Sequence, residues 1–100
     1  MSVMITVEFK IKPEKVNKAL EEMREGLPAT RNFKGCLRID SYFDKKNSSL
    51  FLLEFWDSLE AQKKYLKWRL SNHSESVNNS IEANLFEPPI FKIYEAMPDL

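Results

Sequence analysis

Strict alternation of apolar and polar residues marks the first structural element of the chain. Apolar side chains stand at every odd position from Val3 to Ile11, whereas most of the even positions between them are polar. This period of two is the period of a β-strand with one buried face. Residues 3–11 are therefore predicted to form a strand whose odd positions, Phe9 among them, face a core.

Residues 35–43 and 50–56 have the same strand character and are separated by the polar segment 44–49, which predicts a β-hairpin. One set of apolar residues in these strands is expected to face the core: Leu37, Ile39, Phe43, Phe51, Leu53 and Phe55. The opposite face is then expected to carry Arg38, Asp40, Tyr42, Leu52, Glu54 and Trp56.

Helical spacing of apolar residues follows the first and the third strand. Pro13 opens the first helix at a position where its missing N–H costs nothing. A second helix is predicted over residues 58–70, with Asp57 as its N-cap and Glu60 as the capping-box partner. A third helical segment is predicted from the spacing of Val77, Ile81 and Leu85.

The elements follow one another in the order strand, helix, strand, strand, helix, strand, with the last strand over residues 90–95. One face of each strand is apolar, and two helices are available to cover it. The pattern predicts an α+β fold of the ferredoxin-like βαββαβ type, with helices over a four-stranded antiparallel sheet. Residues 1–100 are expected to form a single domain, ordered over about 2–96 and loose at the tail.

The predicted outer face of the sheet combines large aromatic side chains with charges of both signs. A plain solvated face is one interpretation, because scattered exposed aromatics are normal. Aromatic and arginine side chains are also enriched in protein interfaces, and charge pairs fix the register of docking. We expect a homodimer formed sheet to sheet, with an interface that includes Tyr42, Glu54 and Trp56.

Composition and charge narrow the possible partners. Fifteen basic residues balance fifteen acidic ones, whereas proteins that bind nucleic acid usually carry a basic excess. No apolar run is long enough to span a membrane. Cys36 is the single cysteine, so no internal disulfide can form, which suits a reducing compartment. We therefore expect a cytoplasmic protein that binds neither nucleic acid nor membrane.

Short motifs along the chain resemble those of a known family. Gly-Cys stands at residues 35–36, Leu-Glu-Phe-Trp-Asp-Ser-Leu-Glu-Ala at 53–61, and Tyr-Leu-Lys-Trp-Arg at 65–69. Pro88 and Pro89 lead into the last strand. In this order, over nearly the whole chain, the motifs resemble the antibiotic-biosynthesis monooxygenase domain of the dimeric α+β barrel superfamily.

The resemblance implies a homodimer whose two sheets pack into a barrel, with a mostly apolar pocket between helices and sheet in each subunit. Some members of the family oxygenate aromatic polyketides or quinols without a metal or a flavin. Other relatives degrade heme, isomerise small phosphorylated compounds or have no assigned activity, and membership does not choose among them. Heme degradation is disfavoured, because the first strand lacks the Asn of that branch and Tyr65 stands where many members have a His.

Two side chains are candidates for a catalytic base, His73 and Tyr65. A base at the pocket could take the proton of a phenol, although a lone His near a helix end is most often a surface residue. Arg31 and Arg69 are candidates to hold an anionic group. The predicted pocket wall, against which a flat ring would stack, contains Phe9, Met23, Phe51, Phe55 and Trp68.

The function that the resemblance favours is a cofactor-independent monooxygenase acting on a small aromatic, quinol-like compound in an apolar pocket. The sequence has no metal-ligand spacing, no Gly-rich phosphate loop and no sign of a flavin or nicotinamide site, so neither a metal nor a cofactor is expected. One alternative is a non-catalytic homodimer that binds a small apolar or aromatic molecule, for instance in a stress response. Another is an isomerase of the same superfamily, which would need a basic cluster in its pocket. Cys36 is expected to be packed and inert.

Overall fold

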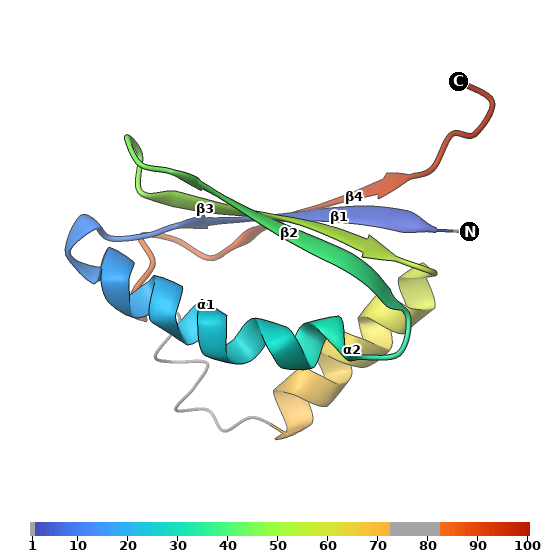
Figure 1. The fold of residues 1–100 in the computed structure, drawn as a ribbon, viewed down its shortest axis with the longest axis horizontal. Helices are drawn as coiled ribbons and strands as arrows, with labels where there is room; N and C mark the ends of the chain where they lie inside the picture. Colours follow the sequence, from blue (N-terminus) through green and yellow to red (C-terminus); the bar gives the residue numbers. More distant parts are fainter. Residues whose placement is uncertain (1, 73–82) are drawn as a thin grey trace.

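The sheet forms one layer of the molecule and two helices form another beneath it (Figure 1). The computed structural model describes residues 2–72 and 83–100. The strands are β1 (Val3–Lys10), β2 (Cys36–Asp44), β3 (Ser49–Trp56) and β4 (Ile90–Glu95). All neighbouring strands are antiparallel, and their order across the sheet is β2-β3-β1-β4. This arrangement confirms the predicted ferredoxin-like α+β fold.

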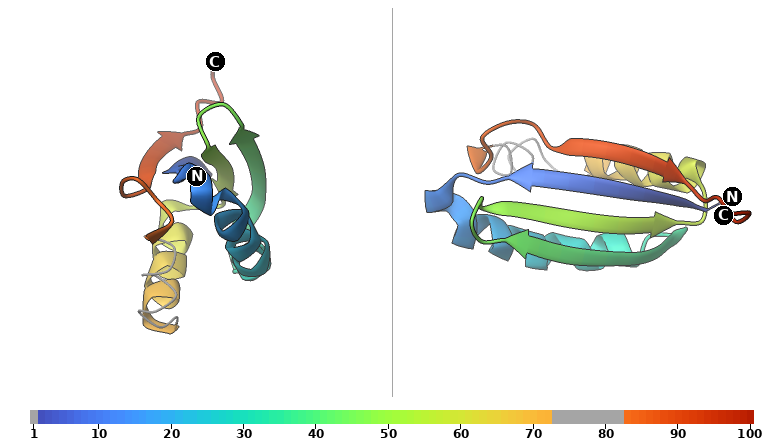
Figure 2. Two further views of the ribbon diagram at one scale, coloured as in Figure 1. Left: turned by 90° about the vertical axis from the view of Figure 1, so that its left-hand side faces the viewer. Right: turned by 90° about the horizontal axis from the view of Figure 1, so that it is seen from above.

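Both helices cover the same face of the sheet, as the end-on view in Figure 2 shows. A 3₁₀ turn, η1 (Pro13–Lys15), leads into α1 (Val16–Arg31), and α2 (Leu59–Asn72) follows β3. α1 continues through Pro28, although this residue has no N–H to donate. Within the described ranges, no helix is long and apolar enough to cross a membrane.

The phase predicted for β3 is wrong. Leu52 and Trp56 are 3% and 0% exposed on the helix side, whereas Phe51 is 37% exposed on the other side. Opposite residues in adjacent strands share a face of the sheet, and Val7 of β1 lies opposite Leu52. Both phases of β3 are rich in apolar residues, so the pairing with β1, whose alternation is clean, decides which side faces the core. The outward residues of β3 are Phe51, Leu53 and Phe55.

A β-bulge at the start of β2 explains a second difference from the prediction. The register between β2 and β3 shifts between Cys36 and Arg38, so Leu37 is an extra residue at this point. Leu37 is 61% exposed, and its predicted place in the core is therefore wrong. Cys36 instead lies opposite Trp56 and faces the helices, and beyond the bulge Ile39 is buried as expected.

The turn before β2 requires a glycine. Gly35 has a φ of +99°, a conformation that residues with a Cβ rarely adopt. A Cβ at this position would lie 2.5 Å from the Cβ of Ala61 and 3.0 Å from Asp57 Oδ1. The Asp57 backbone N–H donates to the Gly35 carbonyl at 2.8 Å. This bond fastens the turn to the end of β3.

The N-cap of α2 lies one residue later than predicted. The Ser58 hydroxyl accepts a hydrogen bond from the Ala61 N–H at 3.1 Å, so Ser58 rather than Asp57 caps the helix. Asp57 instead accepts a hydrogen bond from the Ser58 hydroxyl at 3.2 Å. Ser and Asp are both favoured N-caps, so residue preference alone does not choose between neighbours.

The third predicted helical segment, including Val77 and Ile81, lies mostly outside the described residues. Its last predicted member, Leu85, is buried and forms a bridge with Ile11, just beyond the end of β1. The chain therefore returns to the sheet beside β1 before β4 begins.

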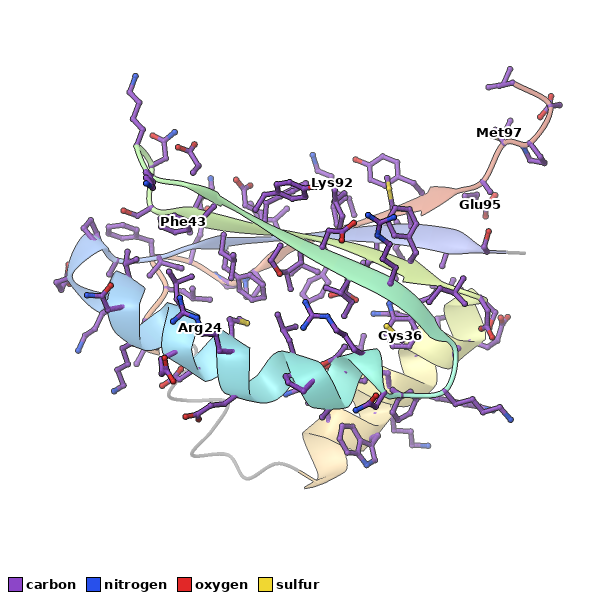
Figure 3. All side chains as sticks on the ribbon, in the orientation of Figure 1. Arg24, Cys36, Phe43, Lys92, Glu95 and Met97 are labelled. Carbon is purple, nitrogen blue, oxygen red and sulfur yellow. The ribbon has the colours of Figure 1, made fainter. Side chains whose placement is uncertain are left out.

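The outer face of the sheet is rich in aromatic and aliphatic side chains, and no described helix covers it. An ion pair joins Arg38 Nε and Asp40 Oδ2 at 2.8 Å on this face, and Lys92 projects from it (Figure 3). The apolar members of this face, termed the outer patch, are Met4, Tyr42, Phe51, Leu53, Phe55, Ile90 and Tyr94.

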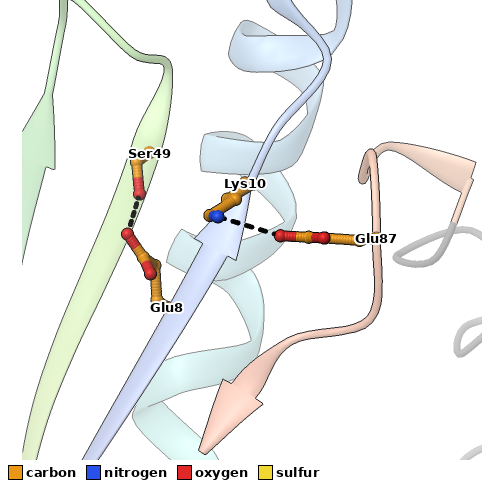
Figure 4. Close-up of polar contacts among 4 residues, drawn as sticks. All are labelled: Glu8, Lys10, Ser49 and Glu87. Atoms are coloured by element: carbon orange, nitrogen blue, oxygen red, sulfur yellow. Dashed lines mark hydrogen bonds and ion pairs between the residues drawn. The ribbon is translucent and has the colours of Figure 1, made fainter.

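Polar contacts join neighbouring segments at one end of the outer face (Figure 4). Ser49 Oγ donates to Glu8 Oε2 at 3.1 Å between β3 and β1. Lys10 Nζ lies 3.0 Å from Glu87, which precedes β4. Charged and apolar side chains thus lie side by side on this face, as the sequence predicts.

Candidate functional site

A cavity of about 180 Å³ lies between the sheet and the two helices. Its wall is mostly hydrocarbon, from Val7, Phe9, Met23, Leu27, Leu52, Leu66 and Phe91. The polar side chains of the wall are Glu54 from β3, Glu22 and Thr30 from α1, and Gln62, Tyr65 and Arg69 from α2. An apolar cavity with a few convergent polar groups is the usual form of a small-molecule site.

One part of the wall is a cluster of three side chains, Thr30, Tyr65 and Arg69, termed the hydroxyl–guanidinium cluster. The hydroxyl oxygens of Thr30 and Tyr65 lie 2.6 Å apart. Arg69 donates from Nε to the Tyr65 hydroxyl and from Nη2 to Thr30 Oγ1 at 2.8 Å. Nη2 also donates to the Gly26 carbonyl at 3.2 Å. The guanidinium is therefore fixed against both helices.

The hydrogen bonds of this cluster leave one hydroxyl proton unused. Thr30 and Tyr65 carry two hydroxyl protons, and the bond between them uses one. Within the described residues, the second proton has no acceptor, and no carboxylate forms a salt bridge with Arg69. The cluster can therefore present a positive charge and an O–H donor to an anion in the cavity.

The environment of Tyr65 favours a donor role over the base role that the sequence also allowed. Burial raises the pKa of the Tyr65 phenol, while its hydrogen bond with Thr30 and the charge of Arg69 oppose this rise only in part. The phenol is consequently neutral near pH 7. A neutral phenol donates a hydrogen bond and is a weak proton acceptor.

The second polar feature of the cavity is Glu54, which is hydrogen-bonded to Trp56. Glu54 is 7% exposed, and its Oε1 accepts a hydrogen bond from Trp56 Nε1 at 3.0 Å. Burial raises the pKa of Glu54, while the indole N–H and the charge of Arg69 partly offset this rise. The prediction that both residues lie at a dimer interface on the outer face is wrong, because the register of β3 turns them toward the helices.

Only some of the predicted site residues lie together at the cavity. Phe9, Met23, Tyr65 and Arg69 line the cavity, and their roles there stay predictions. Phe51 and Phe55 point to the outer face, so their predicted place in the pocket wall is wrong. His73 lies outside the described residues.

Three further candidates lie away from the cavity wall. Trp68 packs against Tyr65 and Phe33, with ring centroids 6.2 Å and 5.6 Å away. Arg31 is exposed beside a separate groove between α1 and β2, where it donates to the Ile39 carbonyl at 3.5 Å. Tyr42 belongs to the outer patch.

Sequence reasoning missed Thr30 and Glu54 as residues of the cavity wall. Thr30 follows Gly26 by four positions, as Arg69 follows Tyr65, so each pair shares one face of its helix. Thr30 also lies two helical turns after Met23, a predicted wall residue, and this spacing is the signal that could have placed it in the site. Glu54 would have required the correct phase of β3.

Cys36 lies on the helix side of β2 (Figure 3). Burial raises the pKa of its thiol, with a smaller contribution from the charge of Glu54. A thiol of this kind is a weak nucleophile near pH 7. In the described part of the chain, no three His, Cys, Asp or Glu side chains gather where they could hold a metal ion.

A sequence model of the antibiotic biosynthesis monooxygenase family matches residues 2–76. The chain belongs to this family. The matched region contains the Gly-Cys turn, the junction of β3 with α2 and the Tyr-Leu-Lys-Trp-Arg motif, so it confirms the resemblance seen in the sequence. No curated protein matches the chain in sequence.

Solved structures of the same fold are distant from this family member in sequence. A conserved protein of Methanosarcina mazei Go1 is 18% identical with a TM-score of 0.82, covering 97% of this chain and 94% of its own. An antibiotic biosynthesis monooxygenase is 23% identical with a TM-score of 0.81, covering 96% and 99%. A dimeric ferredoxin-like protein from an uncultured marine organism is 10% identical with a TM-score of 0.81, covering 96% and 88%. At these identities the similarity shows the fold alone.

Proposed function

We propose that this chain is a cofactor-independent monooxygenase that oxidises a small phenol or quinol in the cavity between the sheet and the helices. The observation that carries the proposal is the combination of a hydrocarbon wall with the hydroxyl–guanidinium cluster. Family membership supports an oxygenase. The chemistry of the cavity supports an aromatic substrate that becomes an anion during the reaction.

The size of the cavity limits the substrate. Its volume is about 180 Å³, and an engineered apolar cavity of roughly 150 Å³ is known to bind benzene. A single aromatic ring with small substituents therefore matches the space. Its hydroxyl would point to the hydroxyl–guanidinium cluster and its ring would lie against the hydrocarbon wall.

In the proposed reaction the substrate itself supplies the electrons. Loss of the phenolic proton leaves a phenolate, which the cluster stabilises. The phenolate passes one electron to dioxygen, and the resulting radical pair combines to form a C–O bond at the ring. Cleavage of the O–O bond, with loss of the ring hydrogen, then yields a quinone and one water. The hydrocarbon wall keeps bulk water from the intermediates.

An oxygen electrode tests this proposal with a panel of one-ring and two-ring phenols and quinols. The wild type should consume oxygen above the buffer rate, and Tyr65→Phe should lower kcat about 10²–10³-fold, because an anion-stabilising donor is lost. Tyr94→Phe removes the same hydroxyl from the outer face and should leave the rate unchanged. No uptake by the wild type across the panel would refute the oxygenase, and equal rates for Tyr65→Phe and wild type would refute the role of the cluster.

The same panel separates the oxygenase from its alternatives. Saturable phenol binding without oxygen uptake would identify a non-catalytic binding protein. An isomerase of phosphorylated compounds has less support, because Arg69 is the single cation among the described residues of the wall.

The outer patch further supports a homodimer. Its aromatic side chains Tyr42, Phe51 and Tyr94 are exposed in the single chain, and the marine protein of the same fold is a dimer. Size-exclusion chromatography with light scattering should give twice the chain mass for the wild type and one chain mass for Phe51→Lys. Leu37→Lys places the same charge on an exposed apolar residue outside the patch and should stay dimeric. A wild type that is monomeric at micromolar concentration would overturn this assembly.

A further inference from the structure

Glu54 is a buried carboxyl on the sheet side of the cavity. It lies in the middle of the sheet, opposite Ile5 of β1 and Ile39 of β2. Its Oε1 accepts the Trp56 N–H at 3.0 Å, whereas Oε2 receives no hydrogen bond from any described residue. A buried carboxylate without full pairing is costly. A hydrogen-bond donor on a ligand would therefore stabilise Oε2 more than it would stabilise an exposed carboxylate oxygen.

Titratable and charged groups approach Glu54 from each element that packs against it. Tyr65 and Arg69 come from α2, Glu22 lines the same cavity from α1, and Cys36 comes from β2. Burial is the largest influence on Glu54 and raises its pKa, while Arg69 lowers the pKa by a smaller amount. The carboxyl consequently holds a proton more tightly than an exposed glutamate does.

We propose that Glu54 is the general base of this site, whose Oε2 accepts the phenolic proton of the substrate. The inference rests on the proposed function and adds the group that starts the reaction. The O–H bond of the substrate breaks, and its electron pair stays on the substrate oxygen. A lone pair of Oε2 forms the new O–H bond. Trp56 holds Oε1 and is a positioning residue, and Arg69 balances the charge of the phenolate.

Glu54 suits this role better than the other polar groups of the wall. A base is most effective when its pKa lies near the working pH, and burial raises the pKa of Glu54 in that direction. Tyr65 is a neutral phenol with a raised pKa, and Arg69 stays protonated. A base and a cation thus face the same cavity from opposite layers of the fold.

Kinetics over a range of pH give the first test. Glu54→Gln keeps the shape and the acceptor for Trp56, and it should lower kcat about 10²–10⁴-fold with little change in KM. The decrease in kcat that the wild type shows at low pH should be absent in Glu54→Gln. Glu60→Gln, an exposed site on α2, should behave as the wild type. In Trp56→Phe the carboxyl remains but loses a hydrogen bond that lowers its pKa, so the fall in rate should move to higher pH. Wild-type kcat and pH profile in Glu54→Gln would overturn the assignment.

Proton uptake gives a second test that needs no turnover. The probe is 4-nitrophenolate, bound about one pH unit above the pKa of the free phenol in two buffers of different ionisation enthalpy. Wild type should take up close to one proton, because two anions in one site cannot both stay ionised. Glu54→Gln should take up almost none, and Glu60→Gln should match wild type. Equal uptake by wild type and Glu54→Gln would overturn the assignment of Glu54.

The two tests fail in distinguishable ways. Glu54-dependent proton uptake without oxygen consumption would refute the oxygenase and leave Glu54 as the proton acceptor of a phenol site. Oxygen consumption that does not depend on Glu54 would refute the base alone. Absence of 4-nitrophenolate binding would count against both.

Discussion

Alanine in place of Gly35 should destabilise the protein by about 2–6 kcal/mol, as the sum of two costs. A residue with a Cβ at a φ of +99° costs about 1–3 kcal/mol in backbone strain. The added Cβ would also lie 2.5 Å from the Cβ of Ala61. Overpacking of this kind costs about 1–3 kcal/mol more. The whole stability of a small domain is only about 5–15 kcal/mol, so the variant should lose a large part of it.

Urea unfolding at a fixed protein concentration measures this loss as a change in the free energy of unfolding. Gly26→Ala is the matched control, because the same methyl group is added inside α1. Apart from the backbone of its own helix, its nearest neighbour would be Arg69 Nη1 at 3.8 Å, an ordinary contact. Alanine is favoured over glycine in a helix by up to about 1 kcal/mol. The same substitution should therefore have opposite signs at the two positions.

A double variant separates the two costs at Gly35. Ala61→Gly removes the methyl group that the new Cβ would meet, but it leaves the strained φ unchanged. Gly35→Ala should then cost about 1–3 kcal/mol less in the Ala61→Gly background than in the wild type. A loss below about 1 kcal/mol for Gly35→Ala alone, or no relief from Ala61→Gly, would refute the reasoning.

Three further predictions follow from burial. Leu52→Ala should lower the free energy of unfolding by about 2–5 kcal/mol and Leu37→Ala by less than about 0.5 kcal/mol; a small loss for Leu52→Ala in urea would contradict the observed phase of β3, and a large loss for Leu37→Ala would contradict the bulge in β2. Because burial raises the pKa of Cys36, iodoacetamide should alkylate this thiol more slowly than free cysteine, and an equal rate would argue against its burial. The folded pKa of Glu54 is raised, so its contribution to stability is full below the unfolded pKa and is lost as pH rises through the folded pKa. In urea titrations, Glu54→Gln should therefore gain stability relative to wild type as pH rises from the unfolded glutamate pKa of about 4.3 through the raised folded pKa, and a constant difference would contradict this linkage.

Local sequence pattern predicted the elements of the fold where only one side of an element is apolar. The alternation that begins at Val3 fixes both the strand and its buried face. β3 is different, because hydrocarbon lies on both of its sides and its own pattern is ambiguous. The information lies in its neighbours: Phe43 pairs with Leu50 across the hairpin. Counting back from the predicted turn would have placed Leu50, and hence Leu52, on the core side.

The candidate site could be predicted only in part. Tyr65 and Arg69 lie four positions apart on one helix, a relation that the sequence shows. Both contact Thr30, which lies 35 positions before Tyr65 in the sequence. This contact depends on how α1 and α2 pack against the sheet. Long-range packing of this kind has no periodic signal in one sequence. The side of Glu54 is a different case, because it follows from the phase of β3, which the pairing of Phe43 with Leu50 fixes.

The two faces of β3 share one backbone. Leu52 and Glu54, which face the cavity, alternate along its eight residues with Leu53 and Phe55, which face outward. Whatever docks on the outside therefore touches the same backbone that forms the floor of the cavity. If docking and a bound ligand prefer different positions of this strand, each must weaken the other by the same factor. Ligand affinity would then vary with protein concentration, and the dissociation constant of the dimer with ligand concentration.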